Sequence, residues 1–319
     1  MKKLFIAFLL LFSFSAFAED LRHLPFNQLL TAIDKQCRNG NKTACNSLAN
    51  LYSSGNEIVN ISSDEKKANE YYFISCQLFG ECSSASHIDY VLQNYKKLCT
   101  DNANKNLSLM MSCVRPFLKE KQSTEITDYV YTQCQNKQFW ACFTLFRHYE
   151  NKEDKQNIAK YYSLLEQSAI QKCEKESYPF VCEMFDYSVN RRMGKPKKYD
   201  GQWQKLYKKI CDEKLPDTGE YNACWLYARN TKTEKEEMEY YNKGCHLGDT
   251  QSCISLSALY FSKKDIKSGR DYFGKACDFG NIHGCIIYQN LDKKLDTQQQ
   301  EQFKDYMKRI ISFYFVDYD

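Results

Sequence analysis

The sequence has 319 residues, of which 12 are glycine, 5 are proline and 26% are charged. Scarce glycine and proline, together with plentiful Lys, Glu, Gln and Leu, favour helices over sheets. The formal net charge is only +4, which gives no argument for an acidic partner, and we predict no binding of nucleic acid. The chain has sixteen cysteines, an even number that indicates disulfides in an exported protein.

The first residues have the three parts of an export signal. Two lysines precede an apolar run at 4–14, and a small-x-small pattern for signal peptidase follows at 16–18. We predict a signal peptide at 1–18 and a mature chain at 19–319, whose formal charge falls to +2 when the two lysines are lost. An amino-terminal membrane helix is the alternative, but the run is short for a span. No later stretch approaches eighteen consecutive apolar residues, so we expect no membrane insertion of the mature chain.

The cysteines fall into eight close pairs along the mature chain. Four pairs have a spacing of eight positions, and the second members of successive pairs lie 29 to 42 positions apart. A period of about 34 residues is the length of a two-helix solenoid repeat. In an exported chain these pairs predict disulfides, which form in the periplasm or outside the cell. The predicted disulfide residues are Cys37 and Cys45, Cys76 and Cys82, Cys99 and Cys113, Cys134 and Cys142, Cys173 and Cys182, Cys211 and Cys224, Cys245 and Cys253, and Cys277 and Cys285.

Other residues keep a fixed distance from the cysteine pairs. An aromatic residue stands four positions before the first cysteine in five pairs, at Tyr72, Tyr95, Tyr207, Tyr241 and Phe273. This spacing places both side chains on one face of a helix. We therefore expect the first cysteine to end one helix and the second to begin the next. Turn glycines suit the left-handed residue that closes a helix, and a bridge across such a turn stabilises by roughly 2.5 kcal/mol in the chain-entropy model.

Two alternatives concern the cysteines. Only seventeen positions separate Cys82 from Cys99, which is cramped for two helices, so the sequence leaves open the pairing among Cys76, Cys82, Cys99 and Cys113. Zinc sites are the other alternative, but the chain has no C-x2-C motif and only five histidines. We predict neither a metal site nor a cofactor.

Segments near both ends carry a family resemblance. Residues 44–55 read ACNSLANLYSSG and residues 64–72 read DEKKANEYY, and the stretch 245–285 repeats the pattern. These segments resemble Sel-one-like repeats, which are relatives of the tetratricopeptide repeat, and the cysteine spacing is similar to that of the Helicobacter cysteine-rich group. The resemblance is strong in 37–78 and 240–290, and weak in 82–130 and 183–235.

The resemblance implies an all-α fold. Such a fold would be a right-handed α/α superhelical solenoid of about seven to eight disulfide-linked helix pairs over 19–319, with a concave binding face. Members of the family mostly act as protein-interaction scaffolds. We therefore expect an exported scaffold that binds another protein or a cell-envelope component, with no catalytic residue. Some cysteine-rich members bind or weakly hydrolyse β-lactams, so a β-lactamase-like hydrolase is the alternative.

The chain contains one match to the S-x-x-K motif of serine β-lactam hydrolases. The match is Ser63 to Lys66, and neither the S-D-N nor the K-T-G companion motif is present. Ser62 and Glu65 also fit a capping box just before a helical pattern. We favour the interpretation that this segment caps a helix.

Three further expectations concern exposure and packing. We expect His246 and His283 to be exposed turn residues, and we expect the abundant tyrosines mainly to pack one helix against the next. Apolar residues at helical spacing in 296–316 predict a final helix that caps the last repeat, with a partner-binding tail as the alternative.

Overall fold

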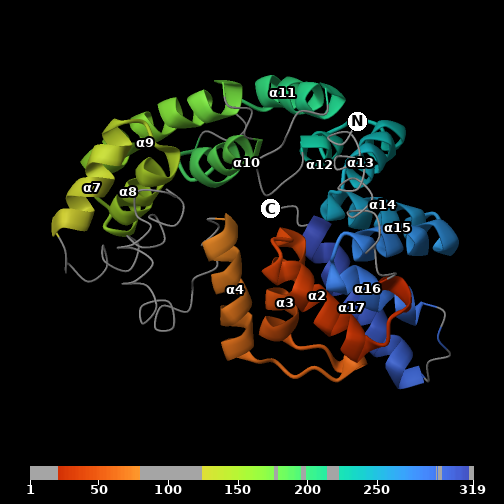
Figure 1. The fold of residues 1–319 in the computed structure, drawn as a ribbon. Coiled ribbons are helices and arrows are strands. Elements are labelled where there is room, and N and C mark those ends of the chain that lie inside the picture. Colours follow the sequence, from red (N-terminus) through yellow and green to blue (C-terminus); the bar gives the residue numbers. More distant parts are fainter. Residues whose placement is uncertain are drawn as a thin grey trace, which may run out of the picture.

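The computed structural model describes most of the chain as helices (Figure 1). Among the described residues, the one β pairing is an isolated bridge between Asn56 and Ile61. The prediction of an all-α fold is therefore confirmed. The predicted signal peptide, Cys82, Cys99 and Cys113, and the side chain of Cys76 lie outside the described part of the chain. The described residues are 21–79, 124–175, 179–194, 199–213, 223–291, 293 and 297–315.

The N-terminal segment contains three α-helices and two short 3-10 helices. Its elements are η1 (Leu21–His23), α2 (Phe26–Arg38), α3 (Lys42–Ser54), η2 (Glu57–Val59) and α4 (Glu65–Phe79).

The middle segment is less regular because two stretches are π-helical. Its elements are α7 (Thr124–Gln135), α8 (Phe139–Asn151), α9 (Lys155–Ile170), the π-helical η3 (Gln171–Lys175), α10 (Pro179–Glu183), the π-helical η4 (Met184–Asn190), α11 (Asp200–Glu213) and α12 (Ala223–Ala228).

The C-terminal segment consists of regular helices. They are α13 (Glu234–His246), α14 (Thr250–Ser262), α15 (Ile266–Asp278), α16 (Ile282–Asn290) and α17 (Thr297–Phe315). The last of these occupies nearly the range predicted for a final helix, 296–316. It packs against α14 and η2, and it buries Phe303, Tyr306 and Ile310.

Polar side chains begin many of these helices. Asn41 Oδ1 accepts a hydrogen bond from the Ala44 amide at 3.1 Å at the start of α3, and Asn281 Oδ1 accepts one from the Gly284 amide at 3.0 Å at the start of α16. The first amides of a helix have no partner within it, so such caps stabilise its start by about 1 kcal/mol. The same arrangement occurs at Asp154, Thr233, Asp249 and Asp265.

Two clusters of buried side chains form the core. The middle cluster joins α7 to α14 and includes Phe146, Leu165 and Trp203. The end cluster includes Leu48 of α3 together with Ile286 of α16. In Figure 1 the helices from α7 to α17 follow a curved path. The N-terminal helix α3 packs against α16, and η2 packs against α17. The two ends of the described chain therefore share one core.

Candidate functional site

Six of the eight predicted cysteine pairs have their sulfur atoms at bonding distance. In the four pairs with a spacing of eight positions, the Cα atoms are 4.5 to 4.7 Å apart. These values fall within the range of disulfides. All twelve cysteines are buried, and none of those described has a free thiol. The other two pairs are Cys173 with Cys182, at 5.4 Å, and Cys211 with Cys224, at 4.9 Å.

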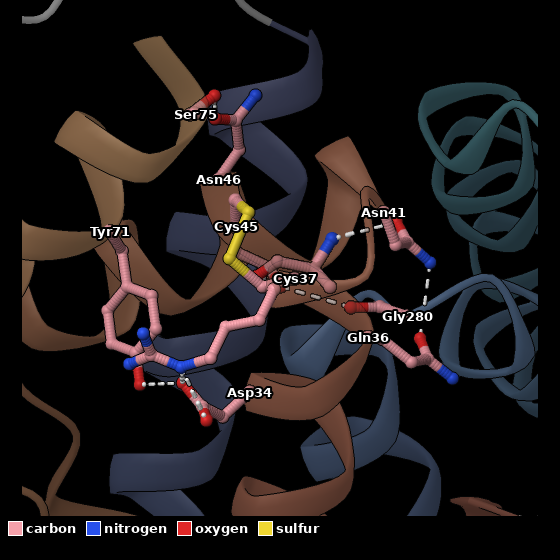
Figure 2. Close-up of a disulfide and its surroundings, with 12 residues drawn as sticks. Asp34, Gln36, Cys37, Asn41, Cys45, Asn46, Tyr71, Ser75 and Gly280 are labelled. Carbon is pink, nitrogen blue, oxygen red and sulfur yellow. Dashed lines mark hydrogen bonds and ion pairs between the residues drawn. A yellow bond between two sulfur atoms is a disulfide. The ribbon is translucent and has the colours of Figure 1, made fainter. Parts of the chain in front are cut away.

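Each pair joins the end of one helix to the start of the next, as the sequence predicted. Figure 2 shows this arrangement for Cys37 at the end of α2 and Cys45 in the first turn of α3. Three turns are closed by a glycine with positive φ: Gly40 at 95°, Gly248 at 94° and Gly280 at 90°. Lys137 takes the corresponding place between Cys134 and Cys142 with a φ of 60°, which the sequence did not reveal because no glycine marks that turn.

Tyrosines pack three of the helices that carry a second cysteine, α3, α8 and α14, against the helix after them. Three such pairs are stacked nearly parallel, with ring centroids 5.3 to 5.8 Å apart. Stacked pairs of this kind stabilise by about 1 kcal/mol beyond the area that they bury. The predicted packing role of the tyrosines is confirmed here. The pairs are Tyr52 with Tyr71, Tyr149 with Tyr161, and Tyr260 with Tyr272.

A second set of contacts joins successive helices that carry a first cysteine. Three tyrosines on these helices stand five positions before the first cysteine of a pair. The hydroxyl of each donates a hydrogen bond to a side chain on the previous helix that carries a first cysteine. We call them the linking tyrosines. Sequence reasoning noticed the tyrosines but could not find their acceptors, because the partners lie about thirty positions away. The bonds are Tyr71 to Asp34 at 2.8 Å, Tyr240 to Asp212 at 3.0 Å and Tyr272 to Asn242 at 2.7 Å.

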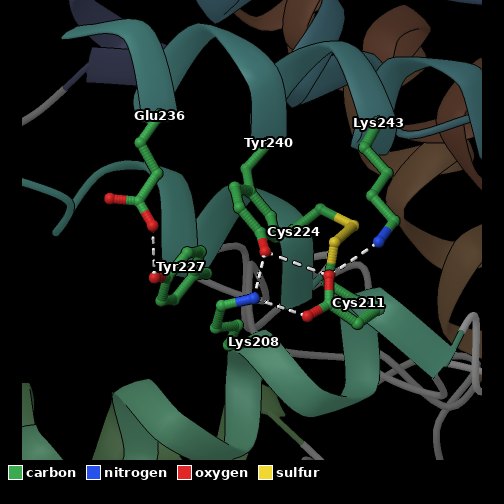
Figure 3. A network of polar contacts seen from close by, with 8 residues as sticks. Lys208, Cys211, Cys224, Tyr227, Glu236, Tyr240 and Lys243 are labelled. Carbon is green, nitrogen blue, oxygen red and sulfur yellow. Dashed lines mark hydrogen bonds and ion pairs between the residues drawn. A yellow bond between two sulfur atoms is a disulfide. The ribbon is translucent and has the colours of Figure 1, made fainter. Parts of the chain in front are cut away.

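The richest of these links is centred on Asp212, and Figure 3 labels its partners Lys208, Tyr240 and Lys243. Its carboxylate accepts from Lys208 Nζ at 2.6 Å, from Lys243 Nζ at 2.7 Å and from the Tyr240 hydroxyl at 3.0 Å. Lys208 Nζ also lies 5.1 Å from the centroid of the Tyr240 ring, within the range of a cation–π contact. We call Lys208, Asp212, Tyr240 and Lys243 the Asp212 cluster.

The electrostatics of the Asp212 cluster favour fully charged groups. Burial acts to raise the pKa of Asp212, but the hydrogen bonds from Lys208, Lys243 and Tyr240 outweigh it and lower that pKa to about 2. The hydrogen bond with Asp212 raises the pKa of Lys208. Two ammonium groups therefore face one carboxylate at neutral pH, and the side chains of Lys208 and Asp212 are 44% and 40% exposed. The two partly exposed lysines therefore offer solvent an excess positive charge above the buried ring of Tyr240.

The S-x-x-K segment lies at the start of α4. Ser63 and Lys66 are both exposed, with Ser63 before the helix and Lys66 in its first turn. The predicted capping box is wrong, because Asp64, and not Ser62, caps the helix. Asp64 Oδ1 accepts from the Lys67 amide at 3.0 Å, and Glu65 is already the first helical residue. The general expectation of a cap in this segment is met by a different side chain.

The two turn histidines differ in exposure. His246 is exposed at the end of α13, as predicted. His283 is only 4% exposed, so the prediction for this residue is wrong. Because α16 already begins at Ile282, the His283 ring lies inside the packing with α17, and its Nδ1 is 2.8 Å from the Tyr306 hydroxyl. Burial lowers the pKa of His283 to about 4, so the ring is neutral at pH 7.

The described residues contain no group of three or more His, Cys, Asp or Glu side chains arranged to hold a metal ion.

Among these same residues, no helix has both the length and the apolar character that a membrane crossing requires.

Comparison with known proteins gives no family for this chain. No protein-family model matches it, and no curated protein matches it either. A functional interpretation therefore depends on the chain's own residues: the buried cysteine pairs, the linking tyrosines and the partly exposed Asp212 cluster. Such an arrangement can present charge at fixed positions.

Proposed function

We propose that the protein is an exported scaffold, a right-handed solenoid of about seven to eight Sel-one-like helix pairs stapled by disulfides. It binds another protein or a cell-envelope component along its concave face. In a repeat array each unit contacts its neighbours, and the stacked units form an extended binding surface. A rigid surface of this kind loses little entropy when a partner binds.

One observation carries this proposal, namely the recurrence of the same unit. Four cysteine turns have nearly equal Cα separations of 4.5 to 4.7 Å. The same tyrosine stack follows three of them, and the linking tyrosines recur at one register position. A solenoid is expected to repeat the same contacts inside each helix pair and between one pair and the next.

The cysteines also support the proposed location. Disulfides persist in oxidising compartments and are rare in the cytosol of most cells. Six buried cysteine pairs at bonding distance fit a periplasmic or secreted protein.

Within this scaffold we place a principal partner contact at the Asp212 cluster. The lysines of the cluster remain partly exposed, with Lys208 at 44% and Lys243 at 29%, whereas Tyr240 is buried and holds Asp212 in place. The excess positive charge of the cluster suits a partner segment that carries carboxylates or other anionic groups. This charge is local, since the whole chain is nearly neutral.

The test is a binding experiment with a matched pair of variants. The oxidised chain is immobilised, envelope extract is applied, and bound material is quantified for Lys208→Gln and for Lys209→Gln. Both lysines lie on α11, and Lys209 is exposed but makes no contact within the Asp212 cluster. We expect Lys208→Gln to lower binding of a specific partner about tenfold, and Lys209→Gln to leave it unchanged. Equal binding by both variants would remove the Asp212 cluster from the proposal, and absence of any specific partner would overturn the scaffold.

The hydrolase alternative is tested on the same preparation. The exposed Ser63 is the residue that a β-lactam would acylate if the S-x-x-K match were functional. We expect no adduct mass and no turnover for the wild-type chain. An adduct that disappears in Ser63→Ala would replace the scaffold by an acylating enzyme.

A further inference from the structure

The two ends of the described chain meet through polar contacts between turns. Asn41 Nδ2 donates to the main-chain oxygen of Phe279 at 3.1 Å. Ser47 Oγ donates to the oxygen of Gly280 at 3.1 Å and accepts from the Ile282 amide at 3.2 Å. These partners are more than 230 positions apart in the sequence. We use the name end joint for the whole surface through which α2, α3 and η1 contact α15, α16 and the turn between them.

The short helix η1 adds a second set of contacts. Gln289 Nε2 donates to the main-chain oxygens of Arg22 and Leu24, at 3.1 and 2.9 Å. Arg22 Nε donates to Asp278 Oδ1 at 2.8 Å, and its Nη2 contacts the other oxygen of that carboxylate. A two-point arginine–carboxylate pair is directional as well as strong, so it specifies how the ends meet.

The end joint continues a series of stacked turns. A methyl group on Gly248, in the turn after α13, would lie 3.7 Å from the ring of Phe279 in the turn after α15. A methyl group on Gly280, in that second turn, would lie 2.8 Å from Asn41 Nδ2 in the turn after α2 (Figure 2). The three turns therefore stack in the order 245–253, 277–285, 37–45. The first turn of the chain occupies the place that a next unit would take.

A surface that joins the front of a unit to the back of another is heterologous, and it has no requirement that both sides come from one molecule. Here the front is carried by α2 and α3 and the back by α15 and α16. Forty-four residues, 80–123, connect α4 to α7 in the sequence. An exchanged dimer would contain two end joints, the same number per chain as the closed monomer.

We infer that the end joint also forms between two copies of this chain, by reciprocal exchange of the N-terminal helices 21–79. The end joint has the same contacts in the monomer and in the exchanged dimer, and association of two chains costs entropy. The closed monomer therefore dominates in dilute solution, and the dimer gains as concentration rises. This inference is independent of the proposed binding function.

The Arg22–Asp278 pair allows a test with complementary charges. In a closed monomer, Arg22→Asp places two acidic groups in the joint, and Asp278→Arg places two basic groups there. In an exchanged dimer of one R22D copy and one D278R copy, one joint holds the reversed pair and the other holds the native pair. Both joints are then attractive, which neither variant achieves alone.

The two full-length variants, one of them isotope-labelled, are mixed in urea with disulfides intact and refolded together. Native mass spectrometry then counts mixed dimers. We expect mixed dimers to exceed the dimers of either variant alone by about tenfold, and the double variant R22D/D278R to behave as the wild type. A mixture without mixed dimers, when the double variant closes normally, would overturn the inference.

A second measurement does not depend on these substitutions. Labelled and unlabelled wild-type chains are refolded together over a range of concentrations. The exchange predicts mixed dimers whose share rises with concentration and falls again on dilution and refolding. A chain that stays monomeric over the whole range would equally overturn the inference.

Discussion

At the scale of single residues, the turn glycines perform two different functions. Gly40 and Gly280 both have φ near 90°, where any side chain is strained. A methyl group on Gly40 would meet no atom within 4 Å, whereas one on Gly280 would lie 2.6 Å from Gln36 Oε1. Gly40 is therefore needed for the backbone alone, whereas a side chain at Gly280 would in addition displace the tips of Gln36 and Asn41.

This difference predicts unequal effects of the same substitution. Gly40→Ala should lower the free energy of unfolding by about 1 kcal/mol, from backbone strain. Gly280→Ala should cost more, because its methyl group also displaces the Asn41 side chain from its hydrogen bond with the Phe279 oxygen. Urea unfolding of the two variants measures both losses. Equal losses would show that the Asn41 hydrogen bond survives the substitution.

The buried His283 makes stability depend on pH. Its folded pKa is about 4, below the ordinary 6.5, so in mild acid the unfolded chain takes up a proton that the folded chain does not. The free energy of unfolding therefore falls as pH drops from about 6.5 towards 4, by about 2 kcal/mol at pH 5 from this residue alone. The docking of α17 depends on the same ring through Tyr306.

His283→Gln should flatten this part of the pH dependence, because glutamine can still hydrogen-bond but does not titrate. Urea unfolding near pH 7.5 and near pH 5 measures the change. The exposed His246 provides the control, since His246→Gln should leave the difference between the two pH values as it is in the wild type. A wild-type slope that persists in His283→Gln would assign the acid sensitivity to other groups.

At the scale of elements, the positions of the cysteine pairs correctly predicted where one helix ends and the next begins. Cys37, Cys45, Cys245 and Cys253 lie where a first cysteine ends a helix and a second begins one. These turns could be predicted because glycine, cysteine and apolar spacing all follow local rules. The helix boundaries between residues 155 and 190 were harder to predict from the sequence.

The difficulty lies in the distance between tyrosine and cysteine. Tyr161 stacks like the other tyrosines but stands twelve positions before Cys173 instead of five, which corresponds to about two extra helical turns. The chain passes through the π-helical stretches η3 and η4 in this region. Neither stretch contains a glycine or proline that would mark an interruption of the helix, so the sequence analysis did not distinguish them.

The proposed disulfide staples predict measurable losses of stability. Replacing Cys245 and Cys253 by alanine should cost roughly 2.5 kcal/mol, and replacing Cys211 and Cys224 should cost roughly 3 kcal/mol, because the second pair closes a longer loop. Urea unfolding of the double variants checks both values. Unchanged stability in either variant would show that the pair does not constrain the unfolded chain.

At the scale of the whole molecule, the sequence predicted neighbours but not the meeting of the ends. The unit pattern extends from one helix pair to the next, and a periodic signal contains no information about where the array stops. The contacts of Asn41, Ser47 and Gln289 cross more than 230 positions and involve side chains that have no special spacing. The same reasoning explains why the acceptors of the linking tyrosines were not found.

The shared core of the ends has a consequence for how the molecule opens. Ile286 of α16 is completely buried in the end cluster, which also contains Leu48 of α3. Ile286→Ala leaves a cavity and should cost about 2–5 kcal/mol. Because one core serves both segments, the substitution should raise amide hydrogen exchange in 26–79 and in 266–310 together.

Leu165→Ala provides the matched control, because Leu165 is equally buried but belongs to the middle cluster. Its effect on exchange should centre on α8 and α9, the helices around it. If Ile286→Ala instead raised exchange in 266–310 alone, the N-terminal helices would have to be held by something other than the end cluster. If exchange rises in both segments together, the N-terminal helices in 26–79 and the C-terminal helices in 266–310 unfold as one unit. Neither segment can then open unless the other separates from it.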